Sequence, residues 1–314
     1  MTSVHCDSRL TDDERRSALY HGDLFVTSPD QATVAFTDFA RELVEDAFGD
    51  LYPEVAQRDL PVAQYVEILS ELKPRFIHHE KSKAFLRAIL ERRGCDLENT
   101  YFDVPRLRTS TSDGYLTSGI AYAWHPHRDT WYSAPASQLN FWLPVYPIVA
   151  GNAMAFHPDY FASAVPNTSG DYNYYEWNTK FRASASSNVG SDSRPLPRPT
   201  VDIDMSNPLV LLPDVGGVIQ FAGQHLHSSV PNYSGRTRFS IDFRTVQIGD
   251  IERGQGAPNV DIECTGSSIR DFIRASDFAR MPDHVVELFK DGTENRGDVL
   301  YAANRAGNVA ANAS

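Results

Sequence analysis

Two short segments of the chain contain side chains that could hold a metal ion together. Residues 124–129 read Trp-His-Pro-His-Arg-Asp, which places His127 and Asp129 two positions apart, and His227 lies in a second polar segment further along. Two histidines and one carboxylate can occupy one face of an octahedral Fe(II) ion and leave three positions open. The sequence therefore predicts a metal site made of His127, Asp129 and His227.

The second segment, residues 226–240, continues with regularly spaced polar residues. It has the pattern H-x-S-x-x-N-x-S-x-x-x-R, which comprises His227, Ser229, Asn232, Ser234 and Arg238. A guanidinium group binds a carboxylate through two parallel hydrogen bonds, which a lysine cannot do. Arg238 beside a metal site therefore suits a dicarboxylate co-substrate. Ser240 falls on the same strand face, so we expect it to share that carboxylate.

An H-x-D triplet alone is weak evidence, because the chain contains three: His5/Asp7, His127/Asp129 and His157/Asp159. The first lies near the N-terminus, and the third contains Pro158, which disturbs strand pairing. His127 follows the apolar run 120–124 and falls where a strand could direct both ligands inward. We therefore prefer the 127/129 pair.

Two H-x-H patterns, His125/His127 and His225/His227, leave other interpretations open. Alternation places the members of each pair on one side of a strand, so a four-histidine zinc or cupin site is an alternative. Cupins also require a glutamate shortly after the first pair, and none follows Asp129 closely. Histidines that bind no metal are the remaining alternative.

Composition limits the kinds of partner that we expect. The chain has 314 residues, is 41% hydrophobic and carries a net charge of −12, which argues against binding to nucleic acid or to an anionic membrane. It has no apolar run of membrane-spanning length and no signal-peptide core. Three widely spaced cysteines indicate no disulfide framework. We therefore expect a cytoplasmic protein that binds a small molecule, and the oligomeric state stays open.

Residues 1–27 are mixed and predict no clear element, whereas helical periodicity begins at residue 28. One helix is expected to start at Ser28, with Pro29 in its first turn, and to end at Gly49. Others are expected over 62–73, ending before Pro74, and over 81–93. Basic residues in and before this last helix favour a solvated face, with contact to an anionic substrate as the alternative: Lys73, Arg75, Lys81, Lys83 and Arg87.

From residue 101 the periodicity becomes that of short strands, expected over 101–109, 118–124, 137–146, 153–156, 208–212, 217–221, 226–230 and 237–247. This pattern predicts an all-β core with flanking helices, a jelly-roll double sheet of the cupin-like, double-stranded β-helix type, over 101–250. The long connection 167–200 is predicted to be a lid or a disordered insert. Helices are expected over 267–281 and 283–291, before a frayed tail from 302. We expect one domain, with 1–100 as its helical N-terminal region and 251–314 as its C-terminal region.

The combined motifs resemble the phytanoyl-CoA dioxygenase-like branch of the Fe(II)/2-oxoglutarate oxygenases. The resemblance spans about residues 101–247 and implies that His127, Asp129 and His227 bind Fe(II). It also implies that Arg238 and Ser229 hold 2-oxoglutarate, with Trp142 beside it. Residues 151–158 are similar to the family's Gly-x-Leu-x-x-x-Pro segment, although they depart from it.

Other residues are assigned to the site by alternation and proximity. Asn140 and Trp142 share a strand face with Gln138, so Asn140 is expected at the co-substrate and Gln138 on the substrate side, with core packing as the alternative. Trp131 and Tyr132 follow the metal loop and are also candidates for substrate contact.

The resemblance implies an enzyme that uses Fe(II), 2-oxoglutarate and O2 to hydroxylate an unactivated C–H bond of a polar, sugar-like or natural-product substrate, releasing succinate and CO2. Two alternatives stay open at this point. One is a cupin-type metal enzyme that does not use 2-oxoglutarate, and the other is a jelly-roll binding module without catalysis.

Overall fold

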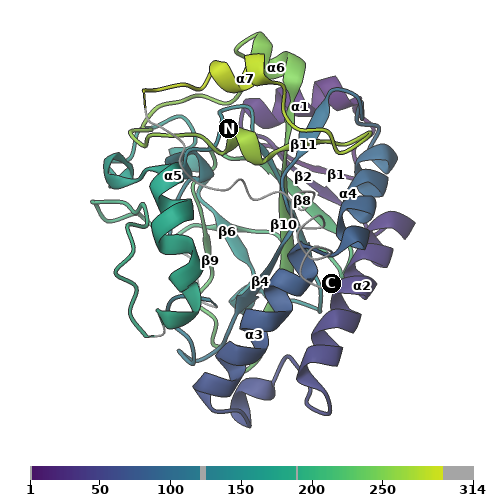
Figure 1. Cartoon of the computed structure of the whole chain (residues 1–314), viewed down its shortest axis with the longest axis vertical. Coiled ribbons are helices and arrows are strands. Elements are labelled where there is room, and N and C mark those ends of the chain that lie inside the picture. Colours follow the sequence, from purple (N-terminus) through teal and green to yellow (C-terminus); the bar gives the residue numbers. More distant parts are fainter. Residues whose placement is uncertain (1, 121–124, 189, 293–314) are drawn as a thin grey trace, which may run out of the picture.

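The structure is a computed structural model that describes residues 2–120, 125–188 and 190–292. Within these residues the chain forms seven α-helices and two β-sheets, so strands and flanking helices are both present as expected. The smaller sheet lies opposite the larger one, and α2, α3 and α4 lie on the far side of the larger sheet (Figure 1).

The larger sheet has the strand order β1-β2-β8-β5-β10-β3-β11, with β4 also paired to β10. Its strands are β1 Val4–Cys6, β2 Leu24–Thr27, β3 Thr100–Phe102, β4 Arg106–Ser110, β5 Leu139–Pro144, β8 Val218–Ala222, β10 Arg238–Gln247 and β11 Ile273–Arg274. The long strand β10 pairs with β5 along one edge and with β4 and then β3 along the other. It is therefore the central element against which most of this sheet is aligned.

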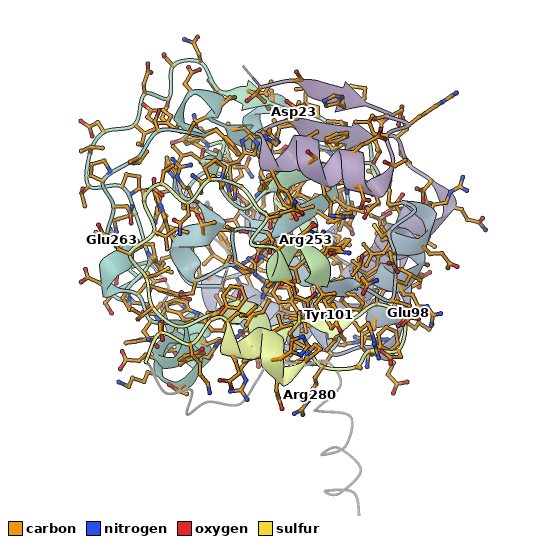
Figure 2. All side chains as sticks on the ribbon, turned by 90° about the horizontal axis from the view of Figure 1, so that it is seen from above. Asp23, Glu98, Tyr101, Arg253, Glu263 and Arg280 are labelled. Atoms are coloured by element: carbon orange, nitrogen blue, oxygen red, sulfur yellow. The ribbon has the colours of Figure 1, made fainter. Side chains whose placement is uncertain are left out.

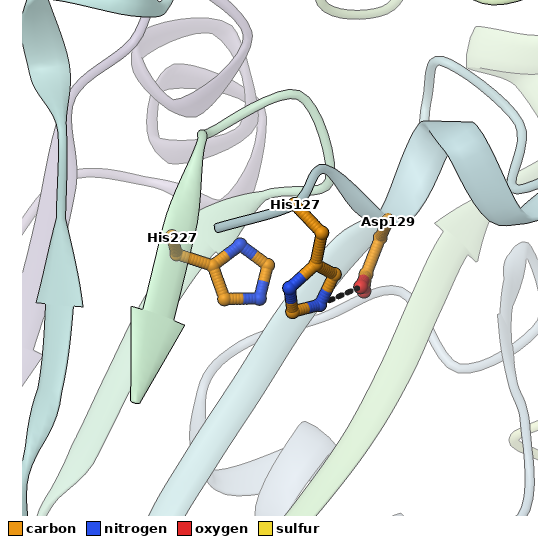
Figure 3. Close-up of side chains that lie close together, drawn as sticks. All are labelled: His127, Asp129 and His227. Atoms are coloured by element: carbon orange, nitrogen blue, oxygen red, sulfur yellow. Dashed lines mark ion pairs between the residues drawn. The ribbon is translucent and has the colours of Figure 1, made fainter. Parts of the chain in front are cut away.

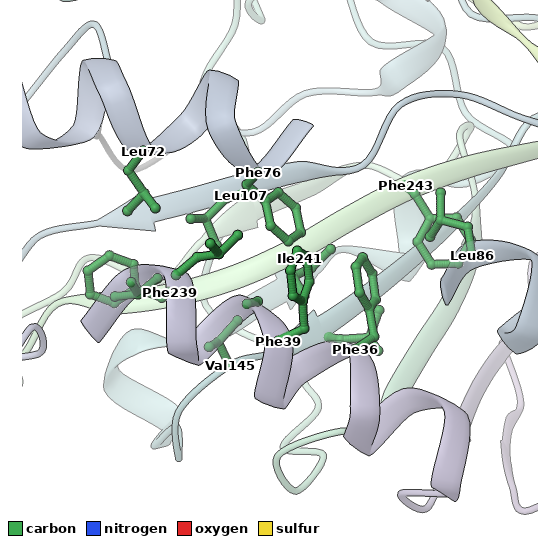
Figure 4. Close-up of a cluster of buried hydrophobic side chains, with 14 of the residues drawn as sticks. Phe36, Phe39, Leu72, Phe76, Leu86, Leu107, Val145, Phe239, Ile241 and Phe243 are labelled. Carbon is green, nitrogen blue, oxygen red and sulfur yellow. The ribbon is translucent and has the colours of Figure 1, made fainter. Parts of the chain in front are cut away.

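Alternation along β10 separates two chemically different faces. The apolar members of the outer face, Phe239, Ile241 and Phe243, are fully buried against the helices in one large hydrophobic cluster (Figure 4). The intervening residues, Arg238, Ser240, Asp242 and Arg244, are polar and lie on the inner face. The outer face therefore anchors the sheet, while the inner face presents charged groups to the space between the sheets.

The smaller sheet has the order β7-β6-β9, with β6 Met154–Phe156, β7 Leu209–Val210 and β9 His227–Ser229. Its buried Met154 and Phe156 pack in one cluster with Trp142, Ile219 and Phe221 of the larger sheet. This shared cluster holds the two sheets face to face.

The helix α2, Gln31–Phe48, starts later than the sequence indicates. Its N-cap is Asp30, whose carboxylate accepts hydrogen bonds from the backbone of Ala32 and Thr33. Ser28 instead donates its backbone N–H and its hydroxyl to Asp7, so the prediction of Ser28 as the cap was wrong. The helix ends as expected at Gly49, which has a φ of 61°.

The helix α3, Val62–Ile77, continues through Pro74, where the sequence predicts its end. The residue that retains the last turn is Phe76, which is fully buried and stacks on Phe36 and Phe39. Tertiary packing here outweighs the local cost of a proline. The helix α4, Glu80–Arg92, matches its predicted range closely.

The two ends of the described chain also contribute to the larger sheet. The first residues form β1, α1 (Asp12–Tyr20) and β2, which the sequence left unassigned. The predicted helix 267–281 was wrong: this segment contains a 3-10 turn, Ser268–Asp271, and then β11, which pairs with β3. Backbone pairing at the sheet edge replaces helical hydrogen bonds.

The other short helices are α5 Tyr174–Glu176, α6 Ile248–Glu252 and α7 Asp283–Glu287. Residues 118–120 form no strand, and the rest of the predicted strand 118–124 and the predicted tail from 302 lie outside the described residues. No helix among the described residues is long and apolar enough to cross a membrane. Charged side chains such as Glu98, Arg253 and Glu263 are exposed at the surface (Figure 2).

Candidate metal centre and co-substrate site

The backbone brings His127 and His227 together directly. The backbone N–H of each residue donates to the carbonyl of the other at 3.0 Å, and the two ring centroids lie 4.3 Å apart. Asp129 is held beside them because its N–H donates to the carbonyl of Gly223 at 2.9 Å. One nitrogen or oxygen atom from each of the three side chains lies within 4.8 Å of the others (Figure 3).

Both histidine rings are oriented by a hydrogen bond to the backbone carbonyl two residues earlier. The Nδ1 atom of His127 lies 2.8 Å from the carbonyl of His125, and that of His227 lies 2.9 Å from the carbonyl of His225. An N–H at Nδ1 directs the Nε2 lone pair toward the centre of the group, as in most histidine-metal sites. Burial, together with the neighbouring His227, lowers the pKa of His127 to about 3, so the ring stays in its metal-binding neutral form.

The carboxylate of Asp129 is held from the side away from the histidines. Its Oδ2 accepts from Gln138 at 3.1 Å and lies 3.4 Å from Nε of Arg244, while Oδ1 lies 3.7 Å from Nε2 of His127. Burial alone would raise the pKa of Asp129, but Arg244 and the two histidines hold it well below its usual value. Gln138 and Arg244 thus fix an ionised carboxylate with Oδ1 directed toward the histidines.

The other histidines considered from the sequence have different surroundings. His225 is buried against the ring of Phe161, at 4.6 Å, and burial lowers its pKa to about 3. His157 is buried with Nε2 3.3 Å from the hydroxyl of Ser228, while Asp159 is exposed. Within the described residues, His127, Asp129 and His227 form the one group of three such side chains close enough to share a metal ion.

Arg238 is a buried cation that has no carboxylate partner among the described residues. Its Nη1 donates to the carbonyls of Asn152 and Ala153 at 2.8 and 3.0 Å, and its Nη2 donates to the hydroxyl of Ser229 at 3.2 Å. No carboxylate of the described residues lies within 4.0 Å of it, and its buried Nε has no hydrogen-bond partner among them. Burial lowers its pKa to about 10. The guanidinium plane also lies 5.6 Å from the ring of Trp142.

Further buried polar atoms near Arg238 lack partners within the described chain. They are the hydroxyls of Ser240 and of Ser110, the residue opposite Arg238 on β4. Further along the same face, the buried amide nitrogen of Asn140, opposite Arg244, also has no partner among the described residues. Buried polar groups are normally hydrogen-bonded, so unsatisfied atoms on one sheet face indicate that a polar ligand completes them. An anionic co-substrate between the metal group and Arg238 fits this inner face.

The three predicted substrate contacts have different environments. Gln138 faces Asp129 and Asn140 rather than an open space, at 3.1 and 2.9 Å. Trp131 is fully buried and donates its indole N–H to Asp261 at 2.8 Å, which favours a structural role. Tyr132 lies edge-on to the ring of His127, 5.6 Å away, and also contacts Tyr172 of the segment 167–200.

Sequence reasoning missed Arg244, Ser110 and Lys73. Arg244 could have been found by alternation from Arg238 along β10, because it lies on the same face six positions later. Ser110 becomes visible only through the register between β4 and β10. Lys73 was assigned to a solvated helix face, yet its Nζ contacts the carbonyl of Ile120 inside the molecule.

The segment 167–200 closes on itself at its base. Asn167 and Pro199 form a bridge, and the N–H of Thr168 donates to the carbonyl of Arg198 at 3.0 Å. Between them the chain forms consecutive helical turns over Tyr174–Ser187. Two aromatic residues of this segment already have partners in the protein. Tyr174 donates to Asp271, and the ring of Trp177 lies 5.0 Å from the guanidinium of Arg194.

No protein-family model matches the sequence, and no curated protein matches it. Among solved structures, EvdO2 from Micromonospora carbonacea var. aurantiaca is 16% identical, with 77% of this chain and 93% of that chain covered and a TM-score of 0.42.

The epimerase SnoN, solved with Fe3+, alpha ketoglutarate and nogalamycin RO, is 14% identical over 74% of this chain and 83% of that chain, with a TM-score of 0.40. The non-heme monooxygenase ThoJ is 14% identical, with 68% and 70% covered and a TM-score of 0.35. These are similarities at low identity, and the function is argued below from the residues of this chain.

Proposed function

We propose that this chain is an Fe(II)- and 2-oxoglutarate-dependent oxygenase that hydroxylates a C–H bond of a small molecule. The observation that carries the proposal is the pairing of two features on one inner surface. These are a buried His-Asp-His group, and a buried arginine that has no carboxylate partner within the described residues. Two facing sheets with this group between them support a double-stranded β-helix within a single domain.

The donor set fits Fe(II), since two neutral imidazoles and one carboxylate form a facial triad. His127, Asp129 and His227 would hold the ion, and iron bound there supplies the redox chemistry that couples 2-oxoglutarate oxidation and O2 reduction to substrate hydroxylation. The carbonyls of His125 and His225 keep the imidazoles oriented, while Gln138 and Arg244 keep Asp129 ionised. The chain itself therefore determines which three positions remain open.

Arg238 would bind the distal carboxylate of 2-oxoglutarate. An isolated buried guanidinium is unfavourable, and a carboxylate offers it a charge-assisted pair of hydrogen bonds. Ser229 already contacts Nη2 of this arginine, and Ser240 and Ser110 add hydroxyl donors on the same inner face. Trp142 would limit the width of this region, and Asn140, opposite Arg244, would offer its amide nitrogen to the part of the co-substrate nearer the metal group.

The proposal is tested by adding Fe(II) and 2-oxoglutarate to the metal-free protein without oxygen. We expect a weak visible charge-transfer band and, once oxygen is admitted, release of succinate. His127→Ala, Asp129→Ala and His227→Ala should each abolish both signals, whereas His157→Ala and Asp159→Ala, from the other H-x-D pair, should retain them.

The same measurements separate the alternatives. A cupin-type enzyme that does not use 2-oxoglutarate would bind metal through the triad without the band or succinate. A binding module without catalysis would show neither metal-dependent signal. Loss of metal in the 157/159 variants, with the 127/129 variants intact, would move the site to the other pair.

A further inference from the structure

Lys73 places an amino group inside the molecule. It lies near the end of α3, is half-buried, and donates from Nζ to the backbone carbonyl of Ile120. No carboxylate oxygen of the described residues lies within 4.0 Å of this nitrogen. Burial, and then the guanidinium of Arg108, lower the pKa of Lys73 to about 7, and the more distant Asp242 offsets only part of this effect. Burying an unpaired ammonium group is unfavourable, so an anion bound beside Lys73 would favour its charged form.

Arg182, in the helical segment 174–187, is a second cation of this kind. Its Nη1 donates to Asn178 at 3.0 Å, and no carboxylate among the described residues lies within 4.0 Å of it. Burial and the neighbouring Arg106 both lower its pKa. Burial also raises the pKa of Asp271, the nearby carboxyl group that accepts from Tyr174, so Asp271 neutralises Arg182 poorly.

These two cations meet a row of arginines on the larger sheet. Arg106 and Arg108 alternate onto one face of β4, which pairs with β10, so Lys73 approaches Arg108 while Arg182 approaches Arg106. The turn that begins at Arg182 also contacts α3. Arg106 and Arg108 each bind an aspartate, Asp103 and Asp242, whereas Lys73 and Arg182 beside them have no carboxylate within 4.0 Å among the described residues.

The carboxylates in this region do not balance its cations once a metal is bound. Its five basic side chains are Lys73, Arg106, Arg108, Arg182 and Arg244, and its four carboxyl groups are Asp103, Asp129, Asp242 and Asp271. Asp129 belongs to the metal group, and burial disfavours the charged form of Asp271. The inner face therefore retains uncompensated positive charge.

A chain of contacts connects this positive charge to the metal group. Asp242 accepts from Nη2 of Arg108 at 3.2 Å and lies 4.0 Å from Arg244, which itself contacts Asp129. The side chains of Arg108, Arg244 and Asp242 are 31%, 20% and 17% exposed although they lie on the inner face of the sheet. Solvent therefore reaches the inner face at this point, next to Asp129.

We infer that the substrate is a small organic anion, whose carboxylate, phosphate or sulfate group binds Lys73 and Arg182 in front of Arg106 and Arg108. This inference rests on the proposed function, because it names the substrate class of the same site. It also reverses the sequence-based preference for a solvated face at Lys73, while Lys81 and Arg87 of α4 are exposed as expected. The anionic group would orient the rest of the molecule toward the metal group.

The inference is tested on metal-free protein labelled with 13C at the lysine Cε positions. The chain contains five lysines, so the Lys73 signal is assigned by its absence in Lys73→Arg. The protonation midpoint of Lys73 is measured in chloride and then in acetate, phosphate or sulfate at the same ionic strength. We expect a midpoint near 7 in chloride, raised by about one pH unit or more by a bound anion.

Two variants supply the comparison. Arg182→Met should raise the anion concentration needed for the shift by about 10-fold, equivalent to about 1.4 kcal/mol. Arg75→Met removes a cation from the same helix, where Arg75 is 49% exposed and pairs with Asp46, and should change nothing. The anion that acts at the lowest concentration separates a carboxylate from a phosphate or sulfate ester.

The inference is overturned if Lys73 titrates like the exposed Lys81 in chloride, if no anion moves its midpoint, or if Arg182→Met responds as wild type does. The readout needs neither iron nor 2-oxoglutarate. A Lys73 shift without the 2-oxoglutarate band would therefore remove the oxygenase proposal and retain the anion site.

Discussion

At the scale of single residues, two arginines of β10 show how one strand face serves two purposes. Arg244 contacts Asp103 at 3.2 Å and Asp129 at 3.4 Å, so its charge is compensated within the protein. Arg238, on the same face, has only neutral oxygens around it in the described chain. The first therefore orders a metal ligand, whereas the second is suited to an external anion.

Arg238→Ala should raise the 2-oxoglutarate concentration required for half-maximal succinate release by about 30-fold or more. Truncating one partner of a buried charge pair costs about 2–5 kcal/mol, much of it from the carboxylate left unpaired. Fe(II) binding should stay unchanged, since the triad is intact. Arg238→Lys should recover only part of the affinity, because an ammonium group lacks the planar fork.

The control for Arg238 is Arg236→Ala. Arg236 is 60% exposed and lies 3.6 Å from Glu54, away from the inner face. An unchanged 2-oxoglutarate requirement in Arg238→Ala would remove this residue from the co-substrate site.

Gln138→Met tests the support of Asp129. The substitution retains the side-chain length but removes the N–H that donates to Oδ2 of Asp129. Loss of such a supporting hydrogen bond should weaken Fe(II) binding by about 10–100-fold, as measured by competition with a chelator. Gln220→Met is the matched control, because Gln220 is buried in β8 and lies beside Phe141 on the opposite face of the sheet. Equal affinities in both variants would contradict the role of Gln138.

The spacing of polar residues predicted that His127, Asp129 and His227 lie together, and the structure places their ligand atoms within 4.8 Å of one another. It also directed attention to Arg238 at the start of β10, whose role at the co-substrate stays a prediction. Spacing could not reveal that Gln138, the residue before β5, donates its side-chain amide to Asp129, because this contact depends on the path of the loop between them. Nor could it reveal Lys73, whose burial depends on how α3 lies across the sheet. Contacts made by tertiary packing leave no local pattern in the sequence.

At the scale of elements, the strands were predicted more accurately than the helix ends. Most predicted strands lie within two or three residues of the observed ones, because strands such as β10 alternate polar and apolar residues, in β10 over Arg238–Arg244. The helix start at Asp30 and the passage of α3 through Pro74 were decided by contacts with Asp7 and Phe36, which are distant in sequence. Local capping rules do not include such contacts.

Tyr174→Phe should loosen the segment 172–182 in the otherwise intact protein. Tyr174 donates to Asp271, and burial raises the pKa of that carboxyl group. Removing the hydroxyl leaves a buried oxygen without its donor, at a cost of about 1–3 kcal/mol. We expect amide hydrogen exchange in this segment to accelerate by about 10-fold, since local opening becomes easier by that amount.

Lys180→Ala is the control for this element. The Lys180–Glu176 pair is about 60% exposed on both sides and stabilises little. If both variants exchange at the wild-type rate, Tyr174 does not hold the segment in place.

At the scale of the whole molecule, the first helix α1 is hydrogen-bonded to α6, the helix that follows β10. In α1, Arg16 donates from Nε to Asp250 of α6 at 2.7 Å, and the hydroxyl of Tyr20 donates to the same carboxylate at 2.9 Å. The neighbouring strand β2 pairs with β8, which in turn pairs with β5. Residues 2–27, in which the sequence showed no clear pattern, therefore complete the large sheet and join it to the segment after β10.

Arg16→Met should lower the free energy of unfolding by about 3–5 kcal/mol. The substitution preserves most of the apolar stem but removes the buried cation of Asp250, and the cation that remains beside this carboxylate, Arg253, is 57% exposed. Removing the buried partner is the costly way to break a buried pair. The carboxylate side chain of Asp250 is only 4% exposed, so water cannot replace the guanidinium. Urea-induced unfolding followed by tryptophan fluorescence measures the change.

Arg274→Met is the matched control, because Arg274 also binds an aspartate, Asp277, through two nitrogens, but with side chains 32% and 51% exposed. It should change the free energy of unfolding much less, because water screens an exposed ion pair. Equal losses in the two variants would mean that the Arg16–Asp250 contact contributes no more than a surface pair, and that the N-terminal segment is held by β2 pairing alone.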